Sequence, residues 1–179
     1  MDNDVCEIVL GGRRCKPQGV CFVSVSDFEW LNQWNWRALK SPRGALAVVR
    51  SIQKGIGRQK KLLMHRVIMN APDGLQVDHR DHDPLNNTRG NLRLCTGSQN
   101  QHNQSCGVRG TSQYKGVSWD KASKRWKAGI GYGGKTYHLG AFCDEHEAAI
   151  AYNNVAREQF GEFACLNVID AALIAALER

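Results

Sequence analysis

Residues 75 to 104 constrain the fold of this chain more than any other segment. An apolar run ends in Asp78-His79, and a second apolar stretch opens twelve residues after the histidine, at Asn91. The residues between them, 80 to 90, are dense in Asp, Asn, Pro and Gly, which favour turns. Asn100 follows in a polar segment suited to the first turn of a helix. A base, a carboxylate and two amides at these intervals are the parts of a phosphodiesterase that uses one metal ion.

The residue types suit phosphodiester hydrolysis. That reaction needs an activated water, a divalent cation on the developing negative charge, and in-line geometry. Imidazole titrates near neutrality, so His79 is the candidate general base. Asp78 is a hard oxygen donor of the kind that Mg²⁺ prefers. Adjacent strand residues point to opposite faces, so these two side chains serve water and metal separately only if the strand breaks there. The polar run supplies that break.

A simpler interpretation is that Asp78-His79 is an ordinary turn pair and that the asparagines only cap and bend the chain. Asp-His is a common dipeptide, and Asn86-Asn87 by itself is typical of a turn. The combination of Asp-His, Asn-Leu-Arg at plus twelve and Gln-Asn at plus twenty-one favours a nuclease site over that interpretation.

Over roughly residues 65 to 104 the pattern resembles the HNH endonucleases. The resemblance implies strand, long loop, strand and helix, the unit called ββα-metal. It implies Asp78 and Asn100 as ligands of Mg²⁺, or of another divalent cation such as Mn²⁺. It implies His79 as the base and Asn91 as the residue that braces the loop and orients His79. The implied products carry 5′-phosphate and 3′-hydroxyl ends.

The chain departs from the family at the third position, which is often histidine. The local sequence is Gln99-Asn100-Gln101-His102-Asn103. At 100° per residue on a helix, His102 lies about 200° from Asn100, whereas Asn103 lies one turn on. Asn100 is the predicted ligand, with Asn103 and His102 as alternatives. His65, just before the motif, is either a phosphate contact or a packed core histidine.

Composition agrees with a DNA-binding protein. The chain has 179 residues, enough for one large domain or two small ones. A net charge of +7 and a pI of 9.2 suggest an anionic partner such as double-stranded DNA. No run of eighteen apolar residues predicts a membrane span, and the acidic N-terminus is not a signal peptide. Seven cysteines without a Cys-x-x-Cys pair argue against structural zinc and disulfides, and favour the cytoplasm of a bacterial or phage-infected cell.

A second module is predicted after residue 110. Residues 111 to 140 carry six bases and one acid, and residues 141 to 162 carry one base and five acids. Alternation predicts a three-stranded sheet with Trp126, Ala128, Ile130, Tyr137 and Leu139 inward. The helical stripe that follows is acidic, so the outer sheet face is left basic. The predicted elements are strands at 114–119, 125–132 and 135–139 and a helix at 144–160, capped by Asp144 with Glu147 and ended by Gly161.

Over about residues 112 to 167 this module resembles the ethylene-response-factor (APETALA-type) DNA-binding domain of plant transcription factors. The landmarks are Tyr-Lys-Gly-Val, Trp-Lys-Ala, Leu-Gly-Ala-Phe, Ala-Ala-x-Ala-Tyr and Leu-Asn. Because two outward positions are glycines, the plant recognition sequence is not carried over. The outward positions implied to touch DNA are Lys115, Ser118, Lys121, Lys127, Gly129, Gly131, Thr136 and His138.

The remaining segments have weaker signals. Val23 to Val25 reads as a strand, and Ser26 with Glu29 as a capping box for a short helix through Gln33. Trp30, Trp34 and Trp36 are predicted to be core, and residues 34 to 66 a small antiparallel sheet. Further expectations are a solvated loop rather than a DNA arm at Arg13-Arg14-Cys15-Lys16, a linker at 105–113 and an amphipathic helix from Val168 to Leu177.

The predicted fold class is α+β: a small N-terminal antiparallel sheet, a ββα-metal nuclease through residue 104, and a sheet-and-helix domain at 114–167. The predicted function is an HNH DNA endonuclease with a DNA-reading domain, similar to phage and mobile-element homing enzymes. A DNA-binding regulator with a decayed nuclease is an alternative, and the intact set of site residues argues against it. A restriction or repair nuclease is a third interpretation.

Overall fold

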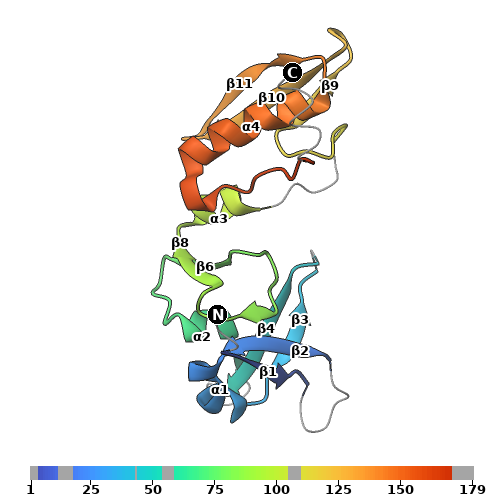
Figure 1. The fold of residues 1–179 in the computed structure, drawn as a ribbon. Coiled ribbons are helices and arrows are strands. Elements are labelled where there is room, and N and C mark those ends of the chain that lie inside the picture. The colour runs from blue at the N-terminus through green and yellow to red at the C-terminus, as the bar shows by residue number, and fades with distance from the viewer. Residues whose placement is uncertain (1–3, 12–17, 43, 54–58, 105–109, 171–179) are drawn as a thin grey trace. The chain divides into compact units, whose positions relative to one another are not determined.

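The computed structural model describes residues 4–11, 18–42, 44–53, 59–104 and 110–170. The chain forms two compact units, residues 1–100 and 101–179. Small antiparallel sheets and few helices make up both units, which confirms the predicted α+β class (Figure 1).

The first unit begins with a three-stranded sheet whose third strand comes from far along the sequence. β1 (Val5–Val9) pairs antiparallel with β2 (Val20–Ser24), and β7 (Asn86–Asn87) pairs parallel with β2. β1 and β7 were not predicted. Neither the five residues of β1 nor the two of β7 show the alternation by which a strand is recognised in sequence.

Helix α1 (Val25–Asn32) follows β2 directly. The predicted capping box is wrong, because Ser24 rather than Ser26 is the N-cap residue. The Ser24 side chain does not cap the helix; its Oγ accepts a hydrogen bond from the Arg89 backbone N–H at 2.9 Å. A contact with a distant segment has thus taken the place of the local one.

The small antiparallel sheet predicted for residues 34 to 66 is confirmed by strands β3 (Arg37–Lys40), β4 (Leu46–Gln53) and β5 (Gln59–Leu63). Trp36 is buried and Trp30 packs against the same core. Trp34 was predicted to be core and is 46% exposed, with the Arg50 guanidinium 3.9 Å from its ring centre.

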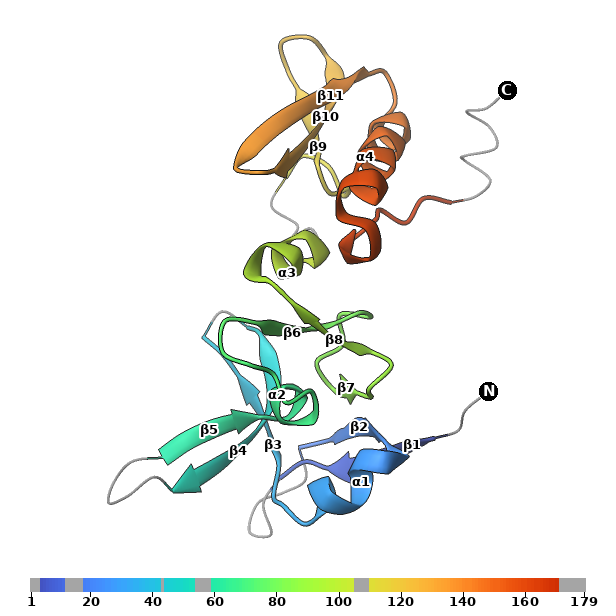
Figure 2. The ribbon, with the colours of Figure 1, turned by 90° about the vertical axis from the view of Figure 1, so that its left-hand side faces the viewer.

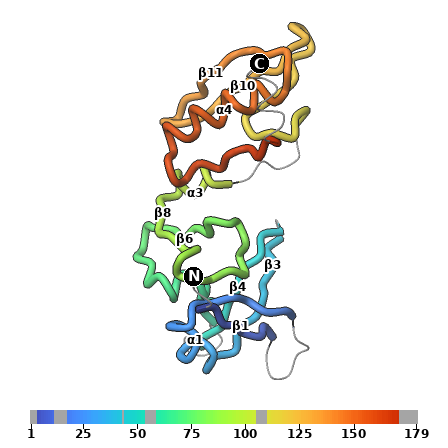
Figure 3. The backbone as a smooth tube through the Cα atoms, viewed as in Figure 1, coloured from blue at the N-terminus to red at the C-terminus, as the bar shows by residue number. Residues whose placement is uncertain are grey.

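Helix α2 (Met64–Ile68) leads from this sheet into a hairpin of β6 (Gln76–His79) and β8 (Leu92–Cys95). Helix α3 (Gly97–Asn103) follows β8 (Figure 3). The order of strand, long loop, strand and helix is therefore the one that the resemblance implied. Val77 and Leu92 of the hairpin join Trp36 in one apolar core.

In the second unit, helix α4 (Glu145–Phe160) covers one face of a sheet (Figure 2). Trp126, Ala128 and Ile130 face the helix as predicted. Tyr137 pairs with Ile130 and shares its face, but its side chain is 38% exposed and stacks on Tyr132. The sheet consists of β9 (Val117–Asp120), β10 (Arg125–Tyr132) and β11 (Lys135–Phe142), and a 3-10 turn, η1 (Gly161–Phe163), follows α4.

The ends of α4 match the sequence prediction. The Asp144 side chain accepts hydrogen bonds from the backbone N–H groups of His146 and Glu147, and Gly161 ends the helix at φ 52°. The Leu-Asn landmark also has a structural role: Asn167 accepts from the Lys115 backbone N–H and donates to its carbonyl. This bond pair joins the chain after α4 to the start of the sheet.

Several sequence predictions fall at the margins of the described chain. Arg13-Arg14-Cys15-Lys16, most of the 105–113 linker and residues 171–179 lie outside it, and residues 168–170 are not helical. The described cysteines 6, 21, 95, 143 and 165 are free thiols. None of the helices in the described ranges has the length and hydrophobicity needed to cross a membrane.

The close approach of β9 to α4 gives a test of the second unit. Gly116 has φ 76°, and a Cβ there would overlap the Tyr152 ring and lie 2.7 Å from the Gly129 carbonyl oxygen. Gly116→Ala should therefore destabilise the unit by about 2–4 kcal/mol through overpacking and left-handed strain.

Gly133→Ala is the matched control, because Gly133 has φ 58° and nothing within 4 Å of the added Cβ. Its cost should be about 1 kcal/mol, from backbone conformation alone. Urea unfolding followed by tryptophan fluorescence measures both variants. Equal losses for the two would contradict the tight packing of Gly116 on Tyr152.

Candidate active site

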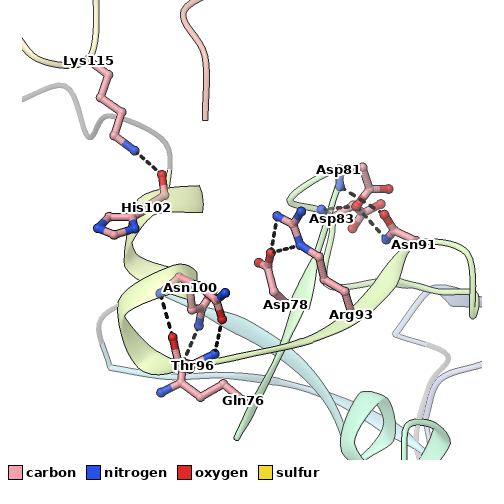
Figure 4. A network of polar contacts seen from close by, with 11 residues as sticks. Gln76, Asp78, Asp81, Asp83, Asn91, Arg93, Thr96, Asn100, His102 and Lys115 are labelled. Carbon is pink, nitrogen blue, oxygen red and sulfur yellow. Dashed lines mark hydrogen bonds and ion pairs between the residues drawn. The ribbon is translucent and has the colours of Figure 1, made fainter. Parts of the chain in front are cut away.

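Asn91 holds the loop that connects β6 to β8. Its Nδ2 donates to Asp81 Oδ1 and to the Asn86 carbonyl, both at 2.8 Å, and its Oδ1 accepts from the Asp81 N–H at 3.1 Å (Figure 4). The Asn91 side chain is 9% exposed, so these bonds are largely shielded from water. Asn91 therefore braces the loop.

The rest of the loop is closed by Asp81 and Asp83. Asp81 accepts from the Asp83 N–H at 2.9 Å and from Asn86 Nδ2 at 2.7 Å, and Asp83 accepts from the Leu85 N–H at 2.9 Å. Burial opposes the charge of Asp81, but the bonds from Asp83, Asn86 and Asn91 outweigh it and lower its pKa. The loop thus has an ionised carboxylate at its centre.

Asp78 forms a buried ion pair with Arg93 across the hairpin. Arg93 Nε lies 2.8 Å and its terminal nitrogen 2.7 Å from Asp78 Oδ2, and each residue is 6% exposed (Figure 4). The two residues are direct cross-strand partners in the β6–β8 register. The sequence pattern predicted no role for Arg93. An arginine in a short apolar strand opposite Asp78 was nevertheless a sign that it could pair with that carboxylate.

Asn100 lies over the face of β6 that carries Asp78. Its Nδ2 donates to Gln76 Oε1 at 2.6 Å, and Gln76 precedes Asp78 by two residues, which places both on one strand face. The bond to Gln76 uses the amide nitrogen of Asn100, so the orientation of Oδ1 is fixed as well. An amide oxygen and a carboxylate on one face are donors that fit a hard divalent cation.

His79 is the last residue of β6 and points to the opposite face. Its ring meets that of His65 edge-on, with ring centres 5.2 Å apart. Burial, His79 and Arg66 lower the pKa of His65 to about 4, which makes it a neutral, half-buried histidine packed on His79. Of the two alternatives for His65, the structure favours packing over a phosphate contact.

Burial also lowers the pKa of His79, despite a hydrogen bond with the Asn87 side chain and the carboxylates of Asp81, Asp78 and Asp83, which raise it. His79 is thus neutral at neutral pH, the state that a general base requires. The strand ends at His79 and the chain turns after it, which meets the condition set by the sequence for separate roles of Asp78 and His79.

The two alternatives to Asn100 are engaged elsewhere. The His102 ring stacks on Phe160 of the second unit, with ring centres 3.8 Å apart, and Asn103 is 4% exposed. Within the described ranges no group of three or more His, Cys, Asp or Glu side chains is arranged to hold a metal ion. Asn100, fixed by Gln76 over the strand face of Asp78, is kept as the candidate ligand.

The positions implied to touch DNA lie mainly on the sheet face away from α4. Cross-strand partners share a face, and the pairs Lys127–Ser118, Gly129–His138 and Gly131–Thr136 place six of them together. Lys127 is 46% exposed and forms an ion pair with Asp120 at 2.7 Å. Lys121 is exposed in the turn after β9.

Lys115 has a different environment. Its ammonium group donates to the backbone carbonyl of His102 at the C-terminal end of α3, at 2.6 Å (Figure 4). It also donates to the carbonyl of Gln104 at 2.6 Å. A cation at a helix C-terminus compensates the exposed carbonyls there. Lys115 thus has a structural role in addition to the one implied by the resemblance.

Comparison with known proteins decides the family. A family model described as HNH endonuclease matches residues 63–102. An HNH endonuclease of Acanthamoeba polyphaga mimivirus, L560, is 40% identical over 155 residues, which cover 83% of this chain and 75% of that protein. The chain belongs to the HNH endonuclease family. It is therefore a hydrolase that cleaves DNA, and enzymes of this family generally depend on a divalent metal ion.

Two other relatives match this HNH endonuclease. Protein 3.8 of Escherichia phage T7 is 33% identical over 93 residues, covering 52% of this chain and 76% of that protein. An AP2-like ethylene-responsive transcription factor of Arabidopsis thaliana is 43% identical over 61 residues, covering 33% of this chain and 18% of that protein. The mimivirus and phage relatives are thus viral, and the plant protein is similar only over a short segment.

The buried pair in the nuclease hairpin leads to a stability prediction. Arg93→Ala leaves the carboxylate of Asp78 buried without its guanidinium, so it should destabilise the first unit by about 3–5 kcal/mol. Arg37→Ala is the control, because Arg37 is exposed and donates one hydrogen bond to Ser51 at 3.1 Å. That change should cost about 0.5 kcal/mol or less.

Urea unfolding at low salt measures both arginine variants. If Arg93→Ala unfolds at the same urea concentration as Arg37→Ala, the ion pair does not stabilise the hairpin. Adding Asp78→Ala to Arg93→Ala should recover part of the loss, because the unpaired charge is then removed.

Proposed function

We propose that the protein is a metal-dependent endonuclease of the homing type that hydrolyses phosphodiester bonds of double-stranded DNA. The observation that carries the proposal is the arrangement around β6. Asn100 is fixed by Gln76 over the strand face of Asp78, and the strand ends in His79, a neutral imidazole. The relatives of viral and phage origin support a role in a mobile element.

The proposed mechanism assigns one task to each of these residues. His79 takes a proton from the water that attacks the scissile phosphorus. Asp78 and Asn100 would hold the cation, Mg²⁺ or Mn²⁺, through their side-chain oxygens. When bound, that cation would supply positive charge that stabilises the phosphate and the departing 3′-oxygen. Arg93 and Gln76 keep the two ligands in place.

The second unit is proposed to bind the DNA duplex with the sheet face away from α4. Ser118, Thr136 and His138 are exposed on that face. The opposite side is occupied by the acidic helix α4, so charge and shape both favour the free face. The short similarity to the plant transcription factor supports this assignment.

The first functional prediction concerns the base and the metal. His79→Ala should reduce cleavage of supercoiled plasmid by roughly 10²–10⁴-fold with little change in DNA affinity. EDTA should abolish cleavage by the wild-type enzyme, and added Mg²⁺ should restore it. A His79→Ala variant that cuts at the wild-type rate would show that the base is misassigned.

Asn100→Ala and His102→Ala form a matched pair on one helix. Asn100→Ala should raise the Mg²⁺ concentration needed for half-maximal cleavage, because a ligand is lost. His102→Ala should leave that concentration unchanged, since its ring stacks on Phe160. The reverse ranking would move the ligand to His102.

The third functional prediction concerns DNA binding by the second unit. Thr136→Glu with His138→Glu adds negative charge to the exposed sheet face, and Asn154→Asp with Gln159→Glu adds the same charge to the exposed side of α4. The first pair should weaken binding to duplex DNA by roughly 10- to 100-fold and flatten its salt dependence.

The α4 pair should change binding little, because it leaves the sheet face intact. Fluorescence polarisation with a labelled mixed-sequence duplex, over a series of salt concentrations, measures both. If the two pairs of substitutions weaken DNA binding equally, the second unit affects binding only through its net charge. That result would contradict DNA binding by the sheet face.

A further inference from the structure

Asn87 is a buried polar residue whose side chain interacts with His79, the proposed base. Its side chain is fully buried, yet it lies in a loop whose neighbours are half-exposed. In sequence it is the second residue of an ordinary turn pair, Asn86-Asn87. Burying an amide is costly unless its polar atoms are bonded, so its position calls for an explanation.

The two ends of the Asn87 amide have different partners. Nδ2 donates to the Pro84 carbonyl at 3.1 Å, and the side chain also interacts with the His79 ring, whose pKa it raises. An interaction that raises the pKa favours the protonated ring, so it is the amide oxygen that faces a ring N–H. Oδ1 is buried and has no hydrogen-bond partner in the part of the chain that the structure describes, which leaves it to accept from the ring.

Asn87 is held by the N-terminal sheet rather than by the nuclease hairpin. It pairs with Val23 in the parallel ladder of β2 and β7. On one side of it the Phe22 N–H donates to the Leu85 carbonyl at 2.8 Å. On the other, Arg89 bonds Asp27 through two nitrogens at 2.8 Å each. The amide is thus fixed before any substrate binds.

We propose that Asn87 is a positioning residue for the DNA cleavage reaction, which fixes the tautomer and orientation of His79. With one ring nitrogen donating to Asn87 Oδ1, the opposite nitrogen is left as an acceptor for the proton of the attacking water. The edge of His65 restrains the ring as well. This inference rests on the proposed role of His79 as the base. Asn91, by contrast, acts on the loop backbone.

A double-mutant cycle tests the proposal with the full-length enzyme. Asn87→Leu should reduce cleavage by roughly 10- to 100-fold, the usual cost of losing a group that orients a catalytic residue, with DNA affinity unchanged. In a His79→Ala background the same substitution should reduce cleavage no further, because there is no ring left to position. A second loss of the same size would overturn the proposal while leaving His79 as the base.

Asn87→Asp separates the two ends of the amide. It keeps an oxygen for His79 and loses the donor to Pro84, so it should retain more activity than Asn87→Leu. Equal loss in the two variants would assign Asn87 to the Pro84 contact alone. Thermal unfolding of each variant identifies any that fails to fold.

The tautomer itself gives a readout that does not depend on cleavage. In enzyme labelled with ¹⁵N-histidine, long-range ¹H–¹⁵N correlations should show one neutral tautomer for His79 in the wild type and a mixture in Asn87→Leu. An unchanged tautomer in Asn87→Leu would overturn the proposal. This result is distinct from failure of His79 as the base, which would be seen as a His79→Ala variant that still cuts DNA.

Discussion

The hydrogen bonds of Asn91 hold the loop between β6 and β8, and the candidate active site depends on them. That loop has only the two-residue strand β7 as regular structure, so side chains must satisfy most of its backbone groups. Asn91 does this at the loop's C-terminal end, where it bonds Asp81 and the Asn86 carbonyl. The loop begins where β6 ends, at His79, so these bonds hold the segment that directly follows the proposed base.

The N-terminal region supports the same loop from outside the hairpin. Asp27 of α1 is 2% exposed and accepts two bonds from Arg89, and Ser24 accepts from the Arg89 backbone. These contacts join residues more than sixty positions apart in sequence, so they form only when the whole first unit has folded. These contacts explain how a small nuclease motif holds its catalytic histidine rigidly, although the motif has no large hydrophobic core of its own.

The sequence predicted what depends on local pattern. The helix from Asp144 to Gly161 and the buried face of β10 follow from periodicity and capping, and both were confirmed. Long-range pairing was not accessible in this way. The Ser24 oxygen accepts from Arg89 and does not cap α1, and Trp34 lies at the surface beneath Arg50 rather than in the core. In the candidate site, the local sequence pattern predicted Asp78 and Asn100 as candidates. It did not predict roles for Arg93 and Asn87, because their positions depend on the register of the β6–β8 hairpin and on the pairing of β7 with β2.

The central claim is that Asp78 and Asn100 hold one divalent cation beside the base. A crystal structure of His79→Ala bound to a DNA duplex and Mn²⁺ tests it directly, because manganese is located by its anomalous scattering. The account predicts one peak within coordination distance of an Asp78 carboxylate oxygen and of Asn100 Oδ1, with a phosphate oxygen among the other ligands. A peak on Asp81 and Asp83, or on His102, with none at Asp78, would contradict it.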